Sequence, residues 1–362
     1  MPQSASMTNA LSLKPDYWRY FAREAAKGGD CPLYAAVATA IADDPAMQAV
    51  TSPARPGQPP ANMLFAAVHD TLLAGADHPL RLYYSHLLKP GEAVRAVDGD
   101  AYGVFRDFVA QHRAAIDPLI AARVTNTNEV RRSSYLRAGY AAIAAEAARP
   151  LGIAELGPSA GLNLNWDRYA YAYRLPDGGV LKGGRDSGLE IDTDVRGAPP
   201  PVPFEPPVVG SRVGLELNAV DLSSPADRRW LVALLWPGLP ERIDRMEKAL
   251  AIAAAHPPSI IAGDALANLP GALADIAPDH SAVVTHSMVT YQWDQPMRNR
   301  LEAALVEAGR ARTVWRLFQD TVEQSGDPAV YTLRLRRYAC GAMTDRVLAE
   351  VHHHGAWIAW KG

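Results

Sequence analysis

The sequence predicts an α/β protein with an N-terminal all-helical module, residues 1–148, followed by a doubly wound parallel sheet, residues 149–362. Two observations lead to this fold class. In the first part, apolar side chains recur at helical spacing, as at Phe105, Phe108 and Val109. After residue 150, short apolar runs alternate with helical segments, which is typical of a sheet with helices on both faces. We expect the helical module to serve as a lid or substrate cap.

The helices of the module follow from this spacing and from the breaks between them. Residues 51–60 are rich in proline and should form a loop. Pro118 should kink or interrupt its helix because it lacks an N–H group. The predicted helices cover residues 15–26, 31–42, 63–74, 102–124 and 131–148.

The sheet is predicted from apolar runs of strand length. Residues 169–210 interrupt the alternation of strands and helices with patterns of period two, so we expect an antiparallel insertion there. The predicted strands of the sheet cover residues 151–156, 212–218, 259–265, 281–287, 313–318, 330–338 and 356–360.

The composition argues against several classes of function. Hydrophobic residues make up 48% of the chain, charged residues 21%, and the net charge is −3. No basic field favours a nucleic acid partner, and no apolar run is long enough to span a bilayer. Cys31 and Cys340 fit no metal or disulfide framework, and the first ten residues do not read as a signal peptide. We therefore expect a cytoplasmic protein with a small-molecule substrate; the sequence leaves its oligomeric state open.

The most informative stretch joins the first predicted strand to the segment after it. The strand ends near Glu155, and a turn built from Gly157, Pro158, Ser159 and Gly161 follows. A strand that enters a helix through such a turn presents unpaired backbone N–H groups to a ligand. Glycine permits close approach to that backbone. The bland alternative is a strand–turn–helix junction without a ligand.

The pattern Glu155-x-Gly157-x-x-x-Gly161 resembles the first motif of class I S-adenosylmethionine-dependent methyltransferases. This resemblance implies a Rossmann-like methyltransferase-type sheet that closes with an antiparallel hairpin. It also implies that the turn binds S-adenosylmethionine, with an acid on the ribose and a Gly-Asp-Ala run near the adenine. The residues that match these positions are Glu155, Gly157, Ser159, Gly161, Glu216 or Asp221, Asp264 and Ala265.

His286 ends the predicted fourth strand, where the resemblance places catalysis. A histidine with a pKa of about 6.5 suits a general base, and Tyr291 could orient the substrate. The alternative is that His286 is a packed or capping residue. The run from His286 to Tyr291 lacks the Asn/Asp-Pro-Pro-aromatic motif of many amine-methylating enzymes. We therefore expect O- or C-methylation of a small-molecule acceptor.

A polar run, residues 125–132, separates two predicted helices. Asn128 and Arg131 are candidate substrate contacts. In this interpretation the run lies over the site, and Arg131 or Arg132 binds a carboxylate. Adjacent arginines cannot face the same way on a helix, so at most one of Arg131 and Arg132 should serve. The alternative for Asn128 is a helix cap, for which asparagine is favoured.

Two further classes of function stay open. Gly157-x-Ser159-x-Gly161 also fits the nucleophile elbow of α/β hydrolases, with Asp264 as the acid and His286 or a histidine of residues 352–354 as the base. A binding protein for a nucleotide-like ligand is the other class. The three adjacent histidines should lie in a solvated loop, because neighbours on a strand point to opposite faces and make a poor metal chelate.

The chain as a whole resembles a bacterial family without an assigned activity, the domain of unknown function 2332 (DUF2332). The resemblance implies the methyltransferase-like fold described above and no known substrate. The matching stretches are residues 127–131, 155–164, 167–169, 229–231, 236–237 and 285–287.

Overall fold

The computed structural model describes residues 14–320 and 331–361 and divides the chain into two compact units. The first unit is Met1–Thr127 with Ser223–Glu247, and the second is Asn128–Leu222 with Lys248–Gly362. The first ten residues, and residue 330 at the start of a predicted strand, lie outside the described residues. The division falls before the predicted boundary at residue 148, because the helix that precedes the first strand packs on the sheet.

The first unit is helical. Its α-helices are α2 (Pro15–Ala26), α3 (Pro32–Ile41), α4 (Pro45–Ala49), α5 (Pro60–Leu73), α6 (Ala101–Gln111), α7 (Arg113–Ala122) and α9 (Pro225–Ala233). Its short 3₁₀ helices are η1 (Lys27–Gly29), η2 (Pro79–Tyr83) and η3 (Ser85–Leu87). The predicted helix 102–124 is broken at His112, whereas Pro118 lies inside α7 without ending it.

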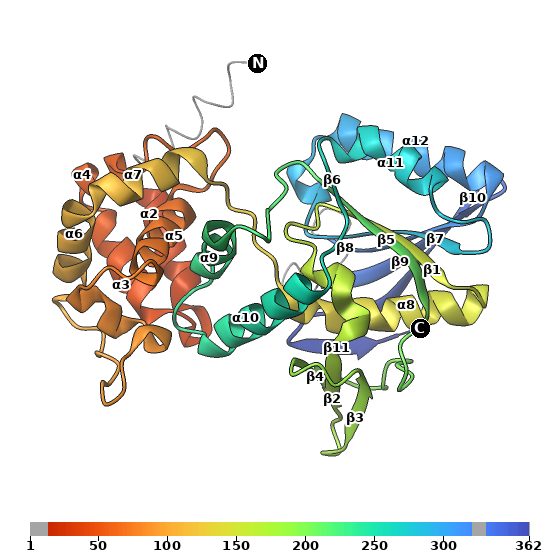
Figure 1. The fold of residues 1–362 in the computed structure, drawn as a ribbon, viewed down its shortest axis with the longest axis horizontal. Helices are drawn as coiled ribbons and strands as arrows, with labels where there is room; N and C mark the ends of the chain where they lie inside the picture. Colours follow the sequence, from red (N-terminus) through yellow and green to blue (C-terminus); the bar gives the residue numbers. More distant parts are fainter. Residues whose placement is uncertain (1–13, 321–330, 362) are drawn as a thin grey trace. The chain divides into compact units, whose positions relative to one another are not determined.

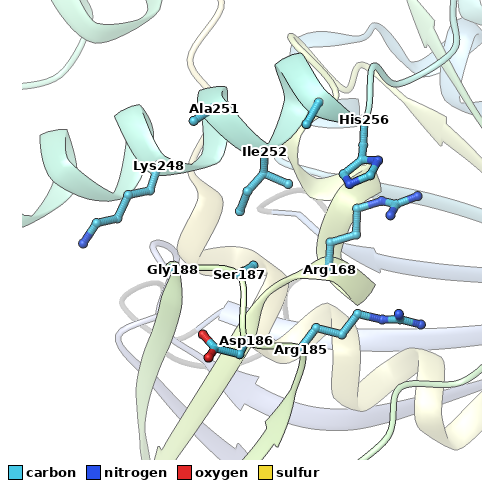
Figure 2. Close-up of a pocket in the computed structure, with 10 residues that line it drawn as sticks. Arg168, Arg185, Asp186, Ser187, Gly188, Lys248, Ala251, Ile252 and His256 are labelled. Atoms are coloured by element: carbon cyan, nitrogen blue, oxygen red, sulfur yellow. The ribbon is translucent and has the colours of Figure 1, made fainter.

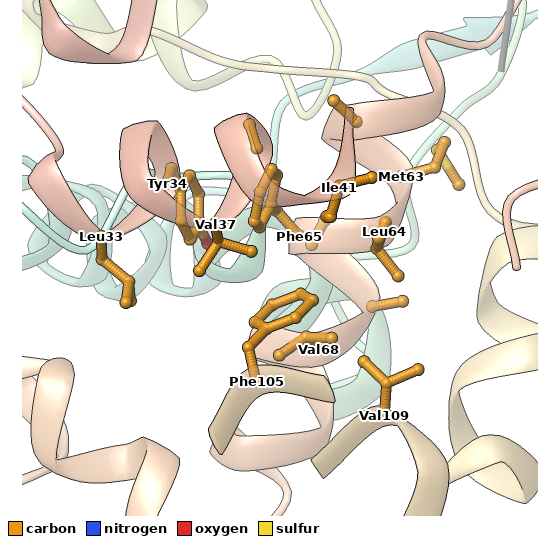
Figure 3. Packing of buried hydrophobic residues seen from close by; sticks show 14 of the residues in the cluster. Leu33, Tyr34, Val37, Ile41, Met63, Leu64, Phe65, Val68, Phe105 and Val109 are labelled. Carbon is orange, nitrogen blue, oxygen red and sulfur yellow. The ribbon is translucent and has the colours of Figure 1, made fainter. Parts of the chain in front are cut away.

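The core of the first unit forms where α3, α5 and α6 meet (Figure 3). Tyr34 stacks on Phe65 with ring centroids 4.0 Å apart. Offset aromatic stacking adds to the gain from burying the rings. Buried side chains from the three helices include Leu33, Val37, Ile41, Met63, Leu64, Val68, Phe105 and Val109.

The second unit is a mixed α/β structure around one large sheet. In the described residues the sheet has 11 strands in the order β3-β2-β4-β11-β10-β9-β8-β7-β1-β5-β6, and most neighbours are parallel. The strands are β1 (Leu151–Leu156), β2 (Ala170–Arg174), β3 (Val180–Gly184), β4 (Glu190–Val195), β5 (Val209–Glu216), β6 (Ile260–Ala262), β7 (Ser281–Ser287), β8 (Val314–Gln319), β9 (Tyr331–Ala339), β10 (Ala342–Val351) and β11 (Trp357–Trp360).

Helices cover both faces of this sheet (Figure 1). On one face α11 (Ala265–Ala274) and α12 (Gln295–Ala311) pack against alternate residues of β1, such as Ala154 and Leu156. On the other face α8 (Ser133–Ala147) packs against β8, where Gly139 lies so close to Leu317 that a Cβ atom would clash. A further helix, α10 (Pro240–Ala255), begins in the first unit and ends in the second. No helix in the described ranges is long and apolar enough to cross a membrane.

Three features of the second unit differ from the sequence-based expectations. The segment after the glycine turn is a 3₁₀ helix, η5 (Leu162–Arg168), instead of an α-helix. The insertion is only partly antiparallel, because β2 pairs antiparallel with β3 but parallel with β4, and β4 joins the main sheet through β11. β10 was not predicted, since its first half is exposed and mostly polar and lacks an apolar run.

Candidate functional site

The glycine turn lies at the carboxyl end of β1, the strand between β7 and β5. Gly157, Ser159 and Gly161 have φ angles of +60°, +57° and +72°, in the left-handed region. Glycine adopts this region freely, but serine does so at a cost in energy. The backbone of Ser159 is therefore held in place by its surroundings.

Packing explains why glycine occupies two of these positions. A Cβ atom on Gly157 would lie 2.9 Å from Val289 Cγ2, and one on Gly161 would lie 2.8 Å from Pro258 Cγ. The turn is thus packed against the segments that follow β7 and precede β6. Side chains at these positions would displace protein atoms.

Glu216, at the end of β5, fixes the turn. Its Oε2 atom accepts a hydrogen bond from Ser159 N–H at 2.8 Å, and its Oε1 atom accepts one from Asn218 N–H at 3.0 Å. A carboxylate has about four acceptor sites, so these two bonds leave acceptor capacity on Glu216. Glu216, which was predicted to bind the ribose of the cofactor, therefore also holds the backbone of the glycine turn.

Glu155 is 4% exposed and points toward the α8 face of the sheet. Burial, reinforced by Glu216, raises its pKa to about 8, while Arg132 acts in the opposite direction. No hydrogen bond or ion pair joins its carboxyl group to any residue that the structure describes. The Glu155 charge contributes to the raised pKa values of Tyr140 and Tyr169, for which burial is the larger cause. A buried, unpaired carboxyl group at a strand end is a candidate ligand contact.

Asn128 has a structural role at the glycine turn. Its Oδ1 atom accepts a hydrogen bond from Leu162 N–H at 3.1 Å, so it caps the first turn of η5. Asn128 does not form the predicted cap of the helix that follows it, because Glu129 is the N-cap of η4 (Val130–Arg132) and accepts from Arg131 N–H at 3.2 Å. Asn128 instead binds a helix that is remote in sequence.

The two arginines of the polar run face different partners. Arg131 donates to Asp192 O at 2.8 Å and pairs with Asp192 Oδ2 at 2.7 Å, on the β4 side. Arg132 donates to His353 O at 2.8 Å, and its charge acts on Glu155 and Tyr291. The structure thus brings Arg132 to the strand ends and leaves Arg131 in an ion pair with the insertion.

The remaining predicted cofactor residues lie at or beyond the ends of β5 and β6. Asp264 is exposed and caps α11, because its Oδ1 atom accepts from Leu266 N–H at 2.7 Å and from Ala267 N–H at 3.3 Å. Ala265 is the first residue of α11. Asp221 is exposed and lies beyond the end of β5.

His286 lies on the opposite face of the sheet from Glu155. Glu155 pairs in register with Thr285, and consecutive residues of a strand alternate between faces. His286 Nε2 accepts from Arg316 Nε at 3.1 Å and Nη2 at 2.9 Å, so the neutral ring has its proton on Nδ1. Burial and the Arg316 charge hold the pKa of His286 well below its usual range. The structure does not bring the predicted base together with Glu155.

The loop after β7 is held by an acid that was not predicted. Asp320 follows β8, and its Oδ2 atom accepts from Thr290 N–H at 2.7 Å and Thr290 Oγ1–H at 2.8 Å. Met288 in this loop has a φ angle of +58°, so it is, like Ser159, a residue other than glycine in the left-handed region. Tyr291 is 46% exposed beside it. The rule that ligands bind at strand ends could have indicated Asp320, since it follows a predicted strand.

The sequence model of a bacterial family, described as uncharacterized proteins conserved in bacteria (DUF2332), matches residues 16–360. The chain belongs to the DUF2332 family. No curated protein and no solved structure matches it. The DUF2332 match covers both units, whereas the glycine turn and Thr285 to Ser287 lie in the second.

For the hydrolase alternative in this DUF2332 protein, the described hydrogen bonds give Asp264 and His286 other partners. Asp264 caps α11, and His286 Nε2 accepts from Arg316. The rings of His352, His353 and His354 lie against one another, with centroids 4.4 Å apart for the first pair and 3.9 Å for the second. The candidate site of this chain is a strand-end arrangement centred on Glu155, Glu216 and the glycine turn.

Proposed function

We propose that this protein binds S-adenosylmethionine at the carboxyl edge of its sheet and transfers the methyl group to a small-molecule acceptor. The observation that carries the proposal is the parallel order β6-β5-β1-β7-β8. From β1 the chain continues to β5 and β6 on one side and then to β7 and β8 on the other. Such a reversal forms a ligand-binding crevice at the carboxyl ends of the strands. Acids stand at the ends of β1, β5 and β6, as the resemblance to methyltransferases implies.

The residues at this edge fit the chemical groups of the cofactor. Glu155 has no protein partner among the described residues and would bind the ammonium group. Glu216 would accept from a ribose hydroxyl, and Asp264 and Ala265 would lie near the adenine. Two polar atoms of η5, Asn163 Oδ1 and Trp166 Nε1, are buried without a described hydrogen-bond partner. Buried unsatisfied atoms of this kind favour a bound polar molecule.

The cofactor supplies a methyl group on a sulfonium, and the acceptor must provide a lone pair. Because His286 is buried against Arg316, we propose that the acceptor needs no histidine base. A carboxylate oxygen meets this condition at neutral pH, which favours O-methylation. We propose Arg132, in place of Arg131, as the basic side chain that orients the acceptor, with Tyr291 beside it.

The proposal is tested by calorimetric titration of the full chain with S-adenosylmethionine and S-adenosylhomocysteine. We expect both to bind, and Glu155→Gln to weaken binding about tenfold or more because a charged hydrogen bond is lost. Glu190→Gln is the matched control, since Glu190 is an exposed acid of the same unit that pairs with Lys182. Absence of binding to the wild-type protein, or equal binding by wild type and Glu155→Gln, would contradict the proposal.

A further inference from the structure

A cavity of about 650 Å³ opens between the end of η5, the loop after β3 and the end of α10. It lies within the second unit, and no acid of the strand-end site lines it. Its volume is in the range of small-molecule sites, roughly 300–1,000 Å³. Its lining includes Arg168, Arg185, Ser187, Lys248, Ile252 and His256.

Two arginines on this cavity, Arg168 and the exposed Arg185, are candidate partners for an anion. Arg168 Nε is buried and has no hydrogen-bond partner in the described ranges. Within the same ranges, no ion pair joins the side chain of Arg185 to a carboxylate. Figure 2 shows both guanidinium groups extended in the same direction. An arginine fork binds an anionic oxygen group bidentately, so the pair is suited to a carboxylate or phosphate.

The side chains of the residues on either side of Arg168 make contacts within the protein. Asp167 pairs with Arg212 through two contacts of 2.6 and 2.8 Å, and Tyr169 Oη donates to Leu162 O at 2.6 Å. These contacts hold the end of η5 and the start of β2. They leave Arg168 as the member of this run that faces the cavity.

The rest of the cavity is suited to an organic body. Ala251, Ile252 and Ala255 present an apolar stripe of α10 to it, and Ile252 points into it in Figure 2. The buried Ser187 Oγ atom has no described hydrogen-bond partner and can donate to a ligand oxygen. Asp186 and Lys248 line the side away from the arginines (Figure 2). The acid thus stands apart from the place where an anionic group would bind.

We propose that this cavity binds a small organic anion, with its carboxylate or phosphate group on Arg168 and Arg185 and its apolar body on Ile252. The site is separate from the carboxyl edge and does not depend on the proposed methyl transfer. Phosphate monoesters and carboxylates share the chemistry that the two arginines recognise, and the two probes below distinguish them.

The test is calorimetric titration of the full chain with phenyl phosphate and with phenylacetate, and with benzyl alcohol as the neutral counterpart. We expect at least one anion to bind with a dissociation constant of about 1 mM or lower and the alcohol not to bind. Arg168→Gln and Arg185→Gln should each weaken binding about tenfold, because a charge-assisted hydrogen bond is lost. Arg310→Gln, at an exposed arginine of α12 paired with Glu307, should leave it unchanged.

Ile252→Ser separates the two parts of the proposed site. It should weaken binding of the aromatic anion and leave binding of inorganic phosphate unchanged. Thermal unfolding of each variant checks that the chain still folds. The proposal is overturned if neither anion binds, if the alcohol binds as well as the anions, or if Arg310→Gln has the same effect as Arg168→Gln.

Discussion

Buried polar side chains on the two faces of the sheet differ in their hydrogen-bond partners. On the α11 and α12 face, His286 accepts from Arg316, Arg316 pairs with Glu302, and Glu302 also binds Arg336 and Tyr338. On the α8 face, Glu155 has no partner among the described residues. Paired buried groups stabilise a fold, whereas an unpaired one costs free energy. His286 is only partly satisfied, because its buried Nδ1 atom has no described hydrogen-bond partner and lies 3.8 Å from Asp320 Oδ2. We infer from the comparison that Glu155 is the better candidate for a ligand contact.

The largest effect should come from breaking the paired network. Arg316→Met removes the donor to His286 and leaves Glu302 without one of its cations. We expect unfolding free energy to fall by about 3 kcal/mol, as for other broken buried pairs. Urea denaturation measures this loss. Arg310→Met, at an exposed site, should change stability by less than about 0.5 kcal/mol, and an equal loss in both variants would contradict the comparison.

For the unpaired acid, Glu155, substitution should raise the unfolding free energy at high pH, whereas substitution of Arg316 should lower it. The folded-state pKa of Glu155 is about 8 and its ordinary value is 4.5, so the folded chain retains a proton that the unfolded chain releases. The contribution of Glu155 to stability is therefore present below pH 4.5 and lost as pH rises to about 8. Glu155→Gln should remove this loss and be more stable than wild type at pH 8. Urea denaturation from pH 5 to 8 tests the sign, and a variant less stable at every pH would refute it.

In the first unit, the buried His69 and the half-buried His86 form a pair that is only partly hydrogen-bonded, between the paired and unpaired cases above. His69 Nδ1 donates to Ala233 O at 3.1 Å, and His69 Nε2 accepts from His86 Nε2 at 2.8 Å, while His86 Nδ1 is buried without a described partner. Burial lowers the pKa of His69 to about 3 and that of His86 to about 4, from 6.5. The folded unit excludes protons that the unfolded chain binds, so stability is lost as pH falls below 6.5.

This loss can be measured as proton uptake on unfolding. At pH 5 we expect uptake of about two protons from the two histidines, seen as a positive slope of unfolding free energy with pH. His86→Gln should reduce the slope by about one proton. A slope that is the same in wild type and variant would show that His86 is not buried as a neutral ring.

The smallest effect concerns backbone strain away from the site. Cys340 and Gly341 form the turn between β9 and β10 with φ angles of +52° and +76°. Asparagine before glycine is preferred in such two-residue turns, so Cys340→Asn should stabilise the chain by about 0.5 kcal/mol. Thermal unfolding detects this gain. A loss of stability would indicate that the Cys340 thiol makes a contact that matters more than the strain.

The sequence predicted what depends on local pattern. Apolar runs located most strands of the sheet, and the glycine turn with Glu155 was found from residue types alone. The helical nature of the first unit also followed from spacing. These features are local because a strand or a turn is defined by a few neighbouring residues.

The features that were not predicted depend on partners remote in sequence. The face on which His286 lies follows from its register with β1, about 130 residues earlier. Whether Arg131 or Arg132 reaches the strand ends depends on Asp192 of the insertion. The 3₁₀ conformation of η5 accompanies the cap from Asn128 and the bond from Arg212 to Leu164 O. None of these contacts leaves a pattern within its own segment.

The most direct test of the account is the number of protons released when S-adenosylmethionine binds, measured by calorimetry in buffers of different ionisation enthalpy. At pH 7 a carboxyl group with a pKa of about 8 is mostly protonated and must ionise to bind an ammonium group. The account predicts that wild type releases about one proton more than Glu155→Gln. Equal release by the two proteins, or no binding by wild type, would contradict a cofactor site built on Glu155.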